Sequence, residues 1–188
     1  MNVLSDRFEE ALIYATRLHA QQVRKGTNVP YISHLLSVAA LVLEDGGNED
    51  EAIAALLHDA VEDQGGEATR AEILTRFGDL VVAIVDGCTE ITANPKPPWR
   101  ERKLQYIEKI RHASLSIQRV SLADKLHNIR SIVADWQRVG DAVWKRFREN
   151  REGTLWFYRS LADIYSEVSS SAMVAELTIA IAKLEKSS

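Results

Sequence analysis

The sequence predicts an all-α fold, because apolar residues recur at helical spacing and almost no segment alternates between apolar and polar residues. Glycine, proline and asparagine separate the periodic segments at intervals that suit helices. The 188 residues, of which 46% are hydrophobic and 27% charged, are typical of one globular domain with a sizeable core. We therefore expect a single compact helical domain over residues 1–188.

The first part of the chain predicts two helices joined by a polar loop. The first covers residues 6–22, where apolar side chains form one stripe. Gly26 and Pro30 prevent this helix from continuing, so the sequence RKGTN should lie in a loop. The second helix covers residues 34–44 and ends at the glycine pair 46–47.

Capping signatures predict where the next helices begin. Asn48 with Glu51 three residues later reads as a capping box for a third helix, which continues through AIAALLHDAVED. Thr69 with Glu72 repeats the signature for a short fourth helix that ends at Gly78. The sequence DLVVAIVDGC then begins another apolar stretch.

The second half of the chain predicts longer helices after a loop. Three prolines in ITANPKPPW, residues 91–99, predict a loop, and RERKLQYIEKIRHA then forms an amphipathic helix. The longest helix should cover residues 115–136, before Gly140. Residues 141–188 predict two or three further helices, with EKSS frayed at the end.

Composition argues against several classes of protein. A net charge of −4 gives no overall electrostatic attraction for duplex nucleic acid. Cys88 is the single cysteine, so an internal disulfide cannot form. Apolar runs are too short to span a bilayer, and MNVLSDRFEE has no signal-peptide pattern, so we expect a cytoplasmic protein without a membrane segment.

Ionisable residues interrupt the apolar pattern of the third helix. His58 and Glu62 are four residues apart, as are Asp59 and Asp63, so two adjacent rows of one helix carry four ionisable groups. Such a face is costly to bury unless the groups have a shared partner. The pattern therefore indicates a functional site.

A second polar pair lies in the sequence RVSLADKLHNIRSI. Asp124 and Asn128 are four apart and share a face among residues that otherwise favour burial. His34, at the start of a predicted helix, supplies another imidazole if that helix packs against the third. Two histidines and two aspartates form a nitrogen and oxygen ligand set suited to Mn, Fe, Co or Zn.

Each of these residues also has an ordinary explanation when taken alone. A lone histidine is more often a packing or surface residue than a ligand, and Asp124 could simply pair with Lys125 or Arg130. We interpret the remaining histidines as packing or surface residues; they are His19, His112 and His127.

Taken together, His34, the doublet His58-Asp59 and Asp124 resemble the signature of the HD-domain metal-dependent phosphohydrolases. The motifs RKGTNVPYISH, LLHDAVED and LADKLHN are similar to those of alarmone hydrolases of the RelA/SpoT type, and PKPPWRERK and GTLWFYR resemble their small stand-alone branch. The similarity spans about residues 20–160. No synthetase region follows, so we do not expect alarmone synthesis.

This resemblance implies Mn²⁺-dependent removal of the 3′-pyrophosphate from (p)ppGpp, which gives GDP or GTP and pyrophosphate. The metal would lower the pKa of a water molecule and polarise the phosphoryl oxygen. Glu62 and Asp63 would position or deprotonate that water without being ligands. The implied ligands of the metal, for which other transition metals would also be suitable, are His34, His58, Asp59 and Asp124.

The resemblance also implies contacts to a small nucleotide substrate. Arg24 and Lys25 would meet the guanine base or a phosphate, and Asn128 would lie near the ribose. The implied contacts to phosphates or sugar are Lys96, Arg100 and Thr154. The alternatives are a polar turn at RKG, a solvated basic loop and a surface amide, while Trp99, Trp156 and Tyr158 would form core or pocket wall.

Two other functions stay open on the sequence alone. The same metal chemistry could act on another nucleotide, such as an adenosine alarmone, the 2′-phosphate of NADPH or a deoxynucleotide. The chain could instead be a nucleotide-binding module without activity, although the complete set of imidazole and acidic groups argues for hydrolysis. The sequence leaves the oligomeric state and the regulation open.

Overall fold

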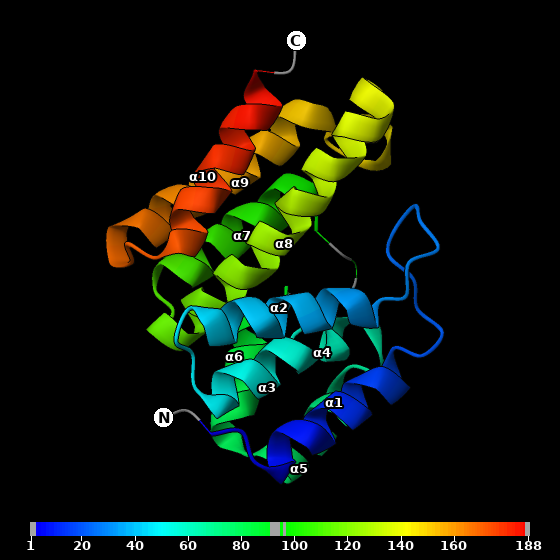
Figure 1. Ribbon diagram of the computed structural model, residues 1–188, viewed down its shortest axis with the longest axis vertical. Helices are drawn as coiled ribbons and strands as arrows, with labels where there is room; N and C mark the ends of the chain where they lie inside the picture. The colour runs from blue at the N-terminus through cyan, green and yellow to red at the C-terminus, as the bar shows by residue number, and fades with distance from the viewer. Residues whose placement is uncertain (1–2, 91–94, 96, 187–188) are drawn as a thin grey trace.

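The computed structural model describes residues 3–90, 95 and 97–186, and over these residues the fold is all-α, as predicted (Figure 1). The helices in chain order are α1 Asp6–Leu18, α2 Ile32–Glu44, α3 Glu49–Leu57, α4 Ala60–Asp63, α5 Glu67–Phe77, α6 Asp79–Cys88, α7 Trp99–Arg111, α8 Leu115–Val139, the 3-10 helix η1 Gly140–Arg146, α9 Asn150–Val168 and α10 Ala172–Glu185. Within this described part, no helix is long and apolar enough to cross a bilayer.

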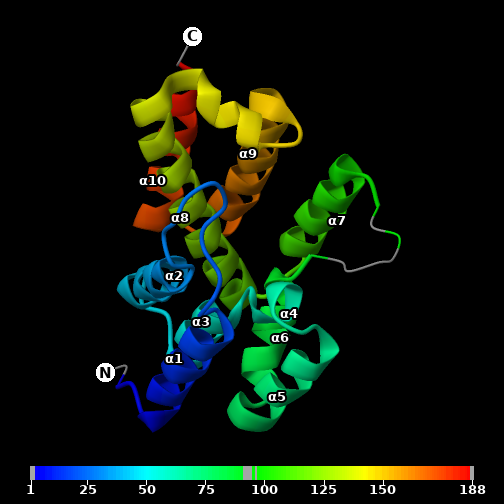
Figure 2. The same cartoon turned by 90° about the vertical axis from the view of Figure 1, so that its right-hand side faces the viewer.

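Helix α8 organises the molecule. It packs on α2, α3 and α6 and also on η1, α9 and α10. Figure 2 shows α8 between these two groups, with α1 and α5 at one end of the molecule and α7 beside α9. Val120, Ala123, Leu126 and Ile129 of α8 are fully buried, so α8 contributes to the core and also brings Asp124 into it.

The first helix is shorter than residues 6–22. It ends at Leu18, and residues 19–31 form a loop whose arms are joined by an isolated antiparallel bridge between Val23 and Pro30. The Arg24 N–H donates to the Val29 carbonyl at 2.8 Å, so this backbone is satisfied within the loop rather than by a helix. Gly26 at the tip has a φ of +75°, which glycine adopts without strain.

The predicted third helix is broken at the His58-Asp59 doublet. The capping box of Asn48 and Glu51 is confirmed, but α3 ends at Leu57 and α4 begins at Ala60. His58 turns its ring back so that Nδ1 donates to the Ala55 carbonyl at 2.8 Å, which competes with the regular helical pattern.

The second capping prediction is wrong. Helix α5 begins at Glu67 after Gly66, and Thr69 lies inside it with its hydroxyl donating to the Gln64 carbonyl at 2.9 Å. The later elements agree better: α8 ends at Val139, three residues beyond the predicted 136, and is capped by Gly140. The 3-10 helix η1 and two further helices follow. Of the predicted loop, residues 91–94 and 96 lie outside the described residues, as do 187–188 of EKSS.

Candidate metal and nucleotide site

The four predicted ligands meet in the interior of the molecule. His34 comes from α2, His58 and Asp59 from the break between α3 and α4, and Asp124 from the middle of α8. His34 Nε2 lies 3.2 Å from Asp124 Oδ1 and 3.7 Å from Asp59 Oδ2. His58 Nε2 lies 3.0 Å from Asp59 Oδ2 and 3.7 Å from Asp124 Oδ1. These four residues form what we call the metal-ligand cluster.

The cluster fits a divalent metal. Two ligands that bind one metal at about 2.1 Å and at a right angle lie about 3.0 Å apart, close to the shorter separations here. The Nε2 atoms of His34 and His58 are buried and have no hydrogen-bond partner. Ligand atoms of His34, His58 and Asp59 all lie within 4.8 Å of one another. A shared cation is the simplest partner for two such nitrogens.

Each imidazole is oriented through its other nitrogen. His58 Nδ1 donates to the Ala55 carbonyl, which leaves the Nε2 lone pair for a metal. His34 Nδ1 lies 2.7 Å from Nδ1 of His127, so His127 must accept if His34 is to keep its Nε2 lone pair free. Burial and the neighbouring His34 and Arg24 lower the pKa of His127 to about 4, which keeps it neutral.

His127 is therefore not the ordinary helix residue that the sequence suggested. It lies three residues after Asp124 on α8 and contacts His34, a predicted ligand from another helix. Its position in LADKLHN was the available signal, because residues three apart share a helix face. His19 is buried, as expected of a packing residue, and His112 pairs with Glu108 on the surface.

Both carboxylates of the cluster have additional donors. The Tyr31 hydroxyl donates to Asp59 Oδ2 at 2.5 Å. Lys125 Nζ donates to Asp124 Oδ2 at 2.6 Å, and the Asn128 amide donates to Asp124 Oδ1. Tyr31 was not predicted as part of the site, although it lies in the PYISH motif, and Lys125 was expected only as an ordinary ion-pair partner.

These contacts set the charge of the cluster. Burial opposes ionisation of Asp124, but Lys125 and the two imidazoles hold its pKa well below the usual range. Burial likewise opposes ionisation of Asp59, but the positive charge of His58, whose own pKa the two carboxylates raise, holds the pKa of Asp59 well below the usual range. A bound metal would take the place of that His58 proton. Both carboxylates are therefore anionic, as metal ligands must be.

The two predicted catalytic carboxylates lie on α4, directly after the doublet. Glu62 and Asp63 are exposed, and the Asp63 N–H donates to the Asp59 carbonyl at 2.9 Å, one helical turn before it. Asp63 Oδ2 accepts a hydrogen bond from the Gln22 amide at 2.7 Å. Glu62 Oε2 accepts one from the Glu90 backbone N–H at 3.4 Å.

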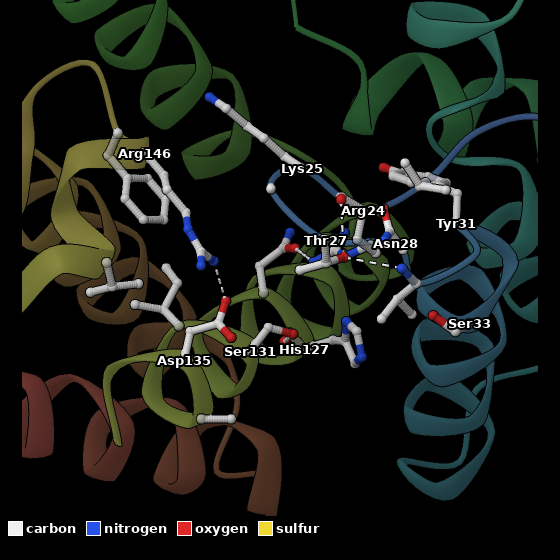
Figure 3. A pocket seen from close by; sticks show the side chains of 18 of the residues that line it. Arg24, Lys25, Thr27, Asn28, Tyr31, Ser33, His127, Ser131, Asp135 and Arg146 are labelled. Carbon is white, nitrogen blue, oxygen red and sulfur yellow. Dashed lines mark hydrogen bonds and ion pairs between the residues drawn. The ribbon is translucent and has the colours of Figure 1, made fainter. Parts of the chain in front are cut away.

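A cavity of about 1190 Å³ opens beside the cluster, between the 19–31 loop, α8 and η1 (Figure 3). Arg24 reaches across it, and its Nη2 donates to Asn128 Oδ1 at 2.6 Å. Asp63 and Tyr31 line the same cavity, so it adjoins both the cluster and a predicted catalytic residue. We call it the larger cavity.

A second cavity of about 350 Å³, the basic cavity, shares Lys25, Asn128, Phe147 and Tyr158 with the first. Its lining has five cationic side chains but one carboxylate, Glu149; the cations are Lys25, Arg102, Lys103, Lys125 and Arg148. The aromatic rings of Trp99, Phe157 and Tyr158 complete the wall. Such a pocket suits an anion attached to a planar group.

The remaining predicted substrate contacts have different outcomes. Thr154 lines the basic cavity, but its hydroxyl donates to the Asn150 carbonyl at 2.7 Å. Arg100 is exposed and lies 3.8 Å over the Trp156 ring, outside the lining of the cavity. Lys96 lies outside the described residues. Lys103 on α7, for which the sequence suggested no role, also lines the basic cavity.

Comparisons with known proteins agree with this geometry. Residues 11–155 match the HD domain family. A Xenopus tropicalis protein named guanosine-3′,5′-bis(diphosphate) 3′-pyrophosphohydrolase MESH1 is 42% identical over 126 residues, which cover 65% of this chain and 68% of that protein. Its Mus musculus counterpart is 39% identical over 142 residues, or 74% of each chain.

A solved structure extends the similarity to almost the whole fold. It is described as a metazoan ortholog of SpoT that hydrolyses ppGpp, and it superposes with a TM-score of 0.79 over 97% of this chain and 98% of that one, at 25% identity. The predicted kinship with stand-alone alarmone hydrolases is thus confirmed. The chain belongs to the HD domain family and, within it, to the type represented by MESH1.

Proposed function

We propose that this protein is a metal-dependent hydrolase that removes the 3′-pyrophosphate of (p)ppGpp, with GDP or GTP and pyrophosphate as products. The observation that carries the proposal is the pair of buried, unpartnered imidazole nitrogens that face two ionised carboxylates beside a nucleotide-sized cavity. The MESH1 relatives bear the name of this activity. A binding module would have no need for so costly a buried cluster.

The metal would be held by His34, His58, Asp59 and Asp124, and we propose Mn²⁺ because this mixed nitrogen and oxygen set suits it. When bound, the ion would supply Lewis acidity that lowers the pKa of a water molecule and polarises the phosphoryl oxygen. Tyr31 and Lys125 keep the two carboxylates in place through the oxygens described above.

Glu62 and Asp63 would orient the attacking water and take its proton. Both lie one turn after Asp59, on a helix that begins directly at the cluster. A general base must reach the water within hydrogen-bond distance, and neither side chain is used as a ligand in this proposal. The attack breaks the bond between the 3′ oxygen and phosphorus, and the 3′ oxygen leaves with a proton.

The two cavities would divide the substrate between them. The larger cavity would take the guanosine, with Arg24 stacked on the base and Asn128 near the ribose. The basic cavity would take the 5′ phosphates, with Lys25 at the junction and Thr154 in the wall. For Lys96 and Arg100 the proposed contacts to phosphates or sugar rest on the resemblance alone, because Arg100 lies outside the lining of the basic cavity.

The test is pyrophosphate release from ppGpp by purified protein that has been stripped of metal and then given Mn²⁺, Mg²⁺ or Zn²⁺. We expect release with Mn²⁺, and none after Asp59→Ala. Parallel reactions decide the substrate: release of pyrophosphate from ppApp, or of inorganic phosphate from NADPH, without release of pyrophosphate from ppGpp would overturn the guanosine assignment. Binding of ppGpp without hydrolysis by any of these metals would leave a binding module.

A further inference from the structure

Gln22 makes a three-way contact that the proposed mechanism does not yet use. Its Nε2 donates to Asp63 Oδ2 at 2.7 Å. Its Oε1 lies 2.6 Å from His19 Nδ1 and 2.5 Å from Gln64 Nε2. A glutamine in a loop is often solvated, whereas this one is half-buried and bonded at both ends of its amide.

The partners determine which way the amide points. An ionised Asp63 can only accept, so the NH₂ group of Gln22 must face it. The Gln22 carbonyl must then accept from both Gln64 and His19, which places the His19 proton on Nδ1. Burial lowers the pKa of His19, so its ring is neutral and keeps this single orientation.

The backbone around Gln22 is fixed as well. Its N–H donates to the His19 carbonyl at 3.0 Å, and its carbonyl accepts from the Tyr31 N–H at 2.9 Å. The His19 ring stacks on the Tyr31 ring at 5.2 Å with 18° between the planes. One loop thus supplies two donors, Tyr31 for Asp59 and Gln22 for Asp63.

We propose that Gln22 is a positioning residue for hydrolysis, which acts by holding the Asp63 carboxylate in one orientation. The inference rests on the proposed function, in which Asp63 handles the proton of the attacking water. Asp63 needs such support because it is an exposed side chain on a four-residue helix. A carboxylate free to change rotamer would be in reactive geometry for only part of the time.

The experiment compares Gln22→Met with Gln21→Met in the Mn²⁺-loaded protein. Methionine has the shape of glutamine but no amide, and Gln21 is an exposed neighbour outside the site. For Gln22→Met we expect kcat for ppGpp to fall roughly 10- to 100-fold, while KM and Mn²⁺ affinity stay within about twofold. For Gln21→Met we expect no change. Crystal structures of both variants should show Asp63 displaced only in Gln22→Met.

A second variant shows whether Gln22 acts through Asp63. In an Asp63→Asn background, Gln22→Met should cause little further loss of kcat, whereas an additive loss would mean that Gln22 acts elsewhere. A raised KM at unchanged kcat would make Gln22 a substrate contact and overturn the inference. A fall in the melting temperature of Gln22→Met large enough to explain the whole loss of kcat would also overturn the inference.

The inference and the proposed function can fail separately. If the wild type does not hydrolyse ppGpp, the proposed function fails, and the position of Asp63 in the two crystal structures still tests the contact. If Gln22→Met does not fold, Gln22→Asn replaces it, because that side chain keeps the amide but is one methylene too short to reach both partners. An unmoved Asp63 with an active enzyme would overturn the positioning role.

Discussion

The metal-ligand cluster and the basic cavity are neighbouring polar regions with opposite construction. The cluster residues lie on helices or directly between them, and His34, His58 and Asp124 are less than one-tenth exposed. In the basic cavity, Lys25 comes from the 19–31 loop and Arg148 from the turn between η1 and α9, and neither forms an ion pair with a described residue. Folding alone therefore arranges the cluster, whereas Lys25 and Arg148 are available to bind an anionic ligand.

Removal of one proposed metal ligand from the cluster should reduce activity more than any other change. Asp59→Ala removes a carboxylate that no flexible side chain can replace in a buried cluster. We expect ppGpp hydrolysis to fall at least about 1000-fold, with loss of Mn²⁺ binding, since the chemistry depends on the metal. Calorimetry of Mn²⁺ binding beside the activity assay measures both. Asp163→Ala, an exposed aspartate on α9, is the matched control, and equal losses in the two variants would contradict a metal role.

The support of a ligand should matter less than the ligand itself. Tyr31→Phe removes the hydroxyl that donates to Asp59 and leaves the ring on His19. We expect Mn²⁺ affinity or activity to fall roughly 10- to 100-fold, as is usual for partners of metal ligands. Tyr14→Phe, whose hydroxyl donates to Glu72 far from the cluster, should leave both quantities unchanged. A Tyr31→Phe variant indistinguishable from the wild type would show that Asp59 needs no such donor.

Glu90, which binds two cations of the basic cavity, tests how much such paired cations contribute to the stability of the fold. It accepts hydrogen bonds from Arg102 and Lys103. Burial opposes its ionisation, but Lys103, Lys125 and Arg102 lower its pKa. We expect Glu90→Gln to reduce the free energy of unfolding by about 1–2 kcal/mol at pH 7.

The pH dependence of this effect has a definite sign. A carboxyl whose pKa is lowered by folding stabilises the folded state above its unfolded pKa, about 4.3, and the contribution is lost as pH falls through the folded pKa. The difference between wild type and Glu90→Gln should therefore shrink below about pH 4. Urea unfolding at several pH values measures it, with exposed Glu108→Gln as the control. A difference that grows in acid would contradict the assigned ionisation.

The smallest effect should come from an unpaired cation. Lys25→Met removes a charge that the fold does not compensate, so we expect stability and Mn²⁺ affinity to be unchanged while KM for ppGpp rises roughly three- to tenfold. The effect should weaken at high salt, because exposed charges are screened. Lys183→Met on α10 is the control. A fall in kcat at constant KM would place Lys25 in the chemical step instead.

Local sequence patterns predicted much of the fold. The capping box of Asn48, the end of α8 at Gly140 and the helical class followed from residues a few positions apart. The errors arose where side-chain bonds compete with the helix, as at His58, or where a loop satisfies its own backbone, as after Leu18. Neither effect produces a periodic pattern of residues along the sequence.

The sequence by itself determined the ligand set as a prediction, because each imidazole and carboxylate lies in a short, distinctive motif. Only the tertiary structure decided what supports those ligands. Contacts of His34 with His127 and of Gln22 with Asp63 join residues 93 and 41 positions apart. Such pairs depend on how α2, α4 and the 19–31 loop lie against α8, and the packing of a hydrophobic core sets that arrangement rather than any pattern along the chain.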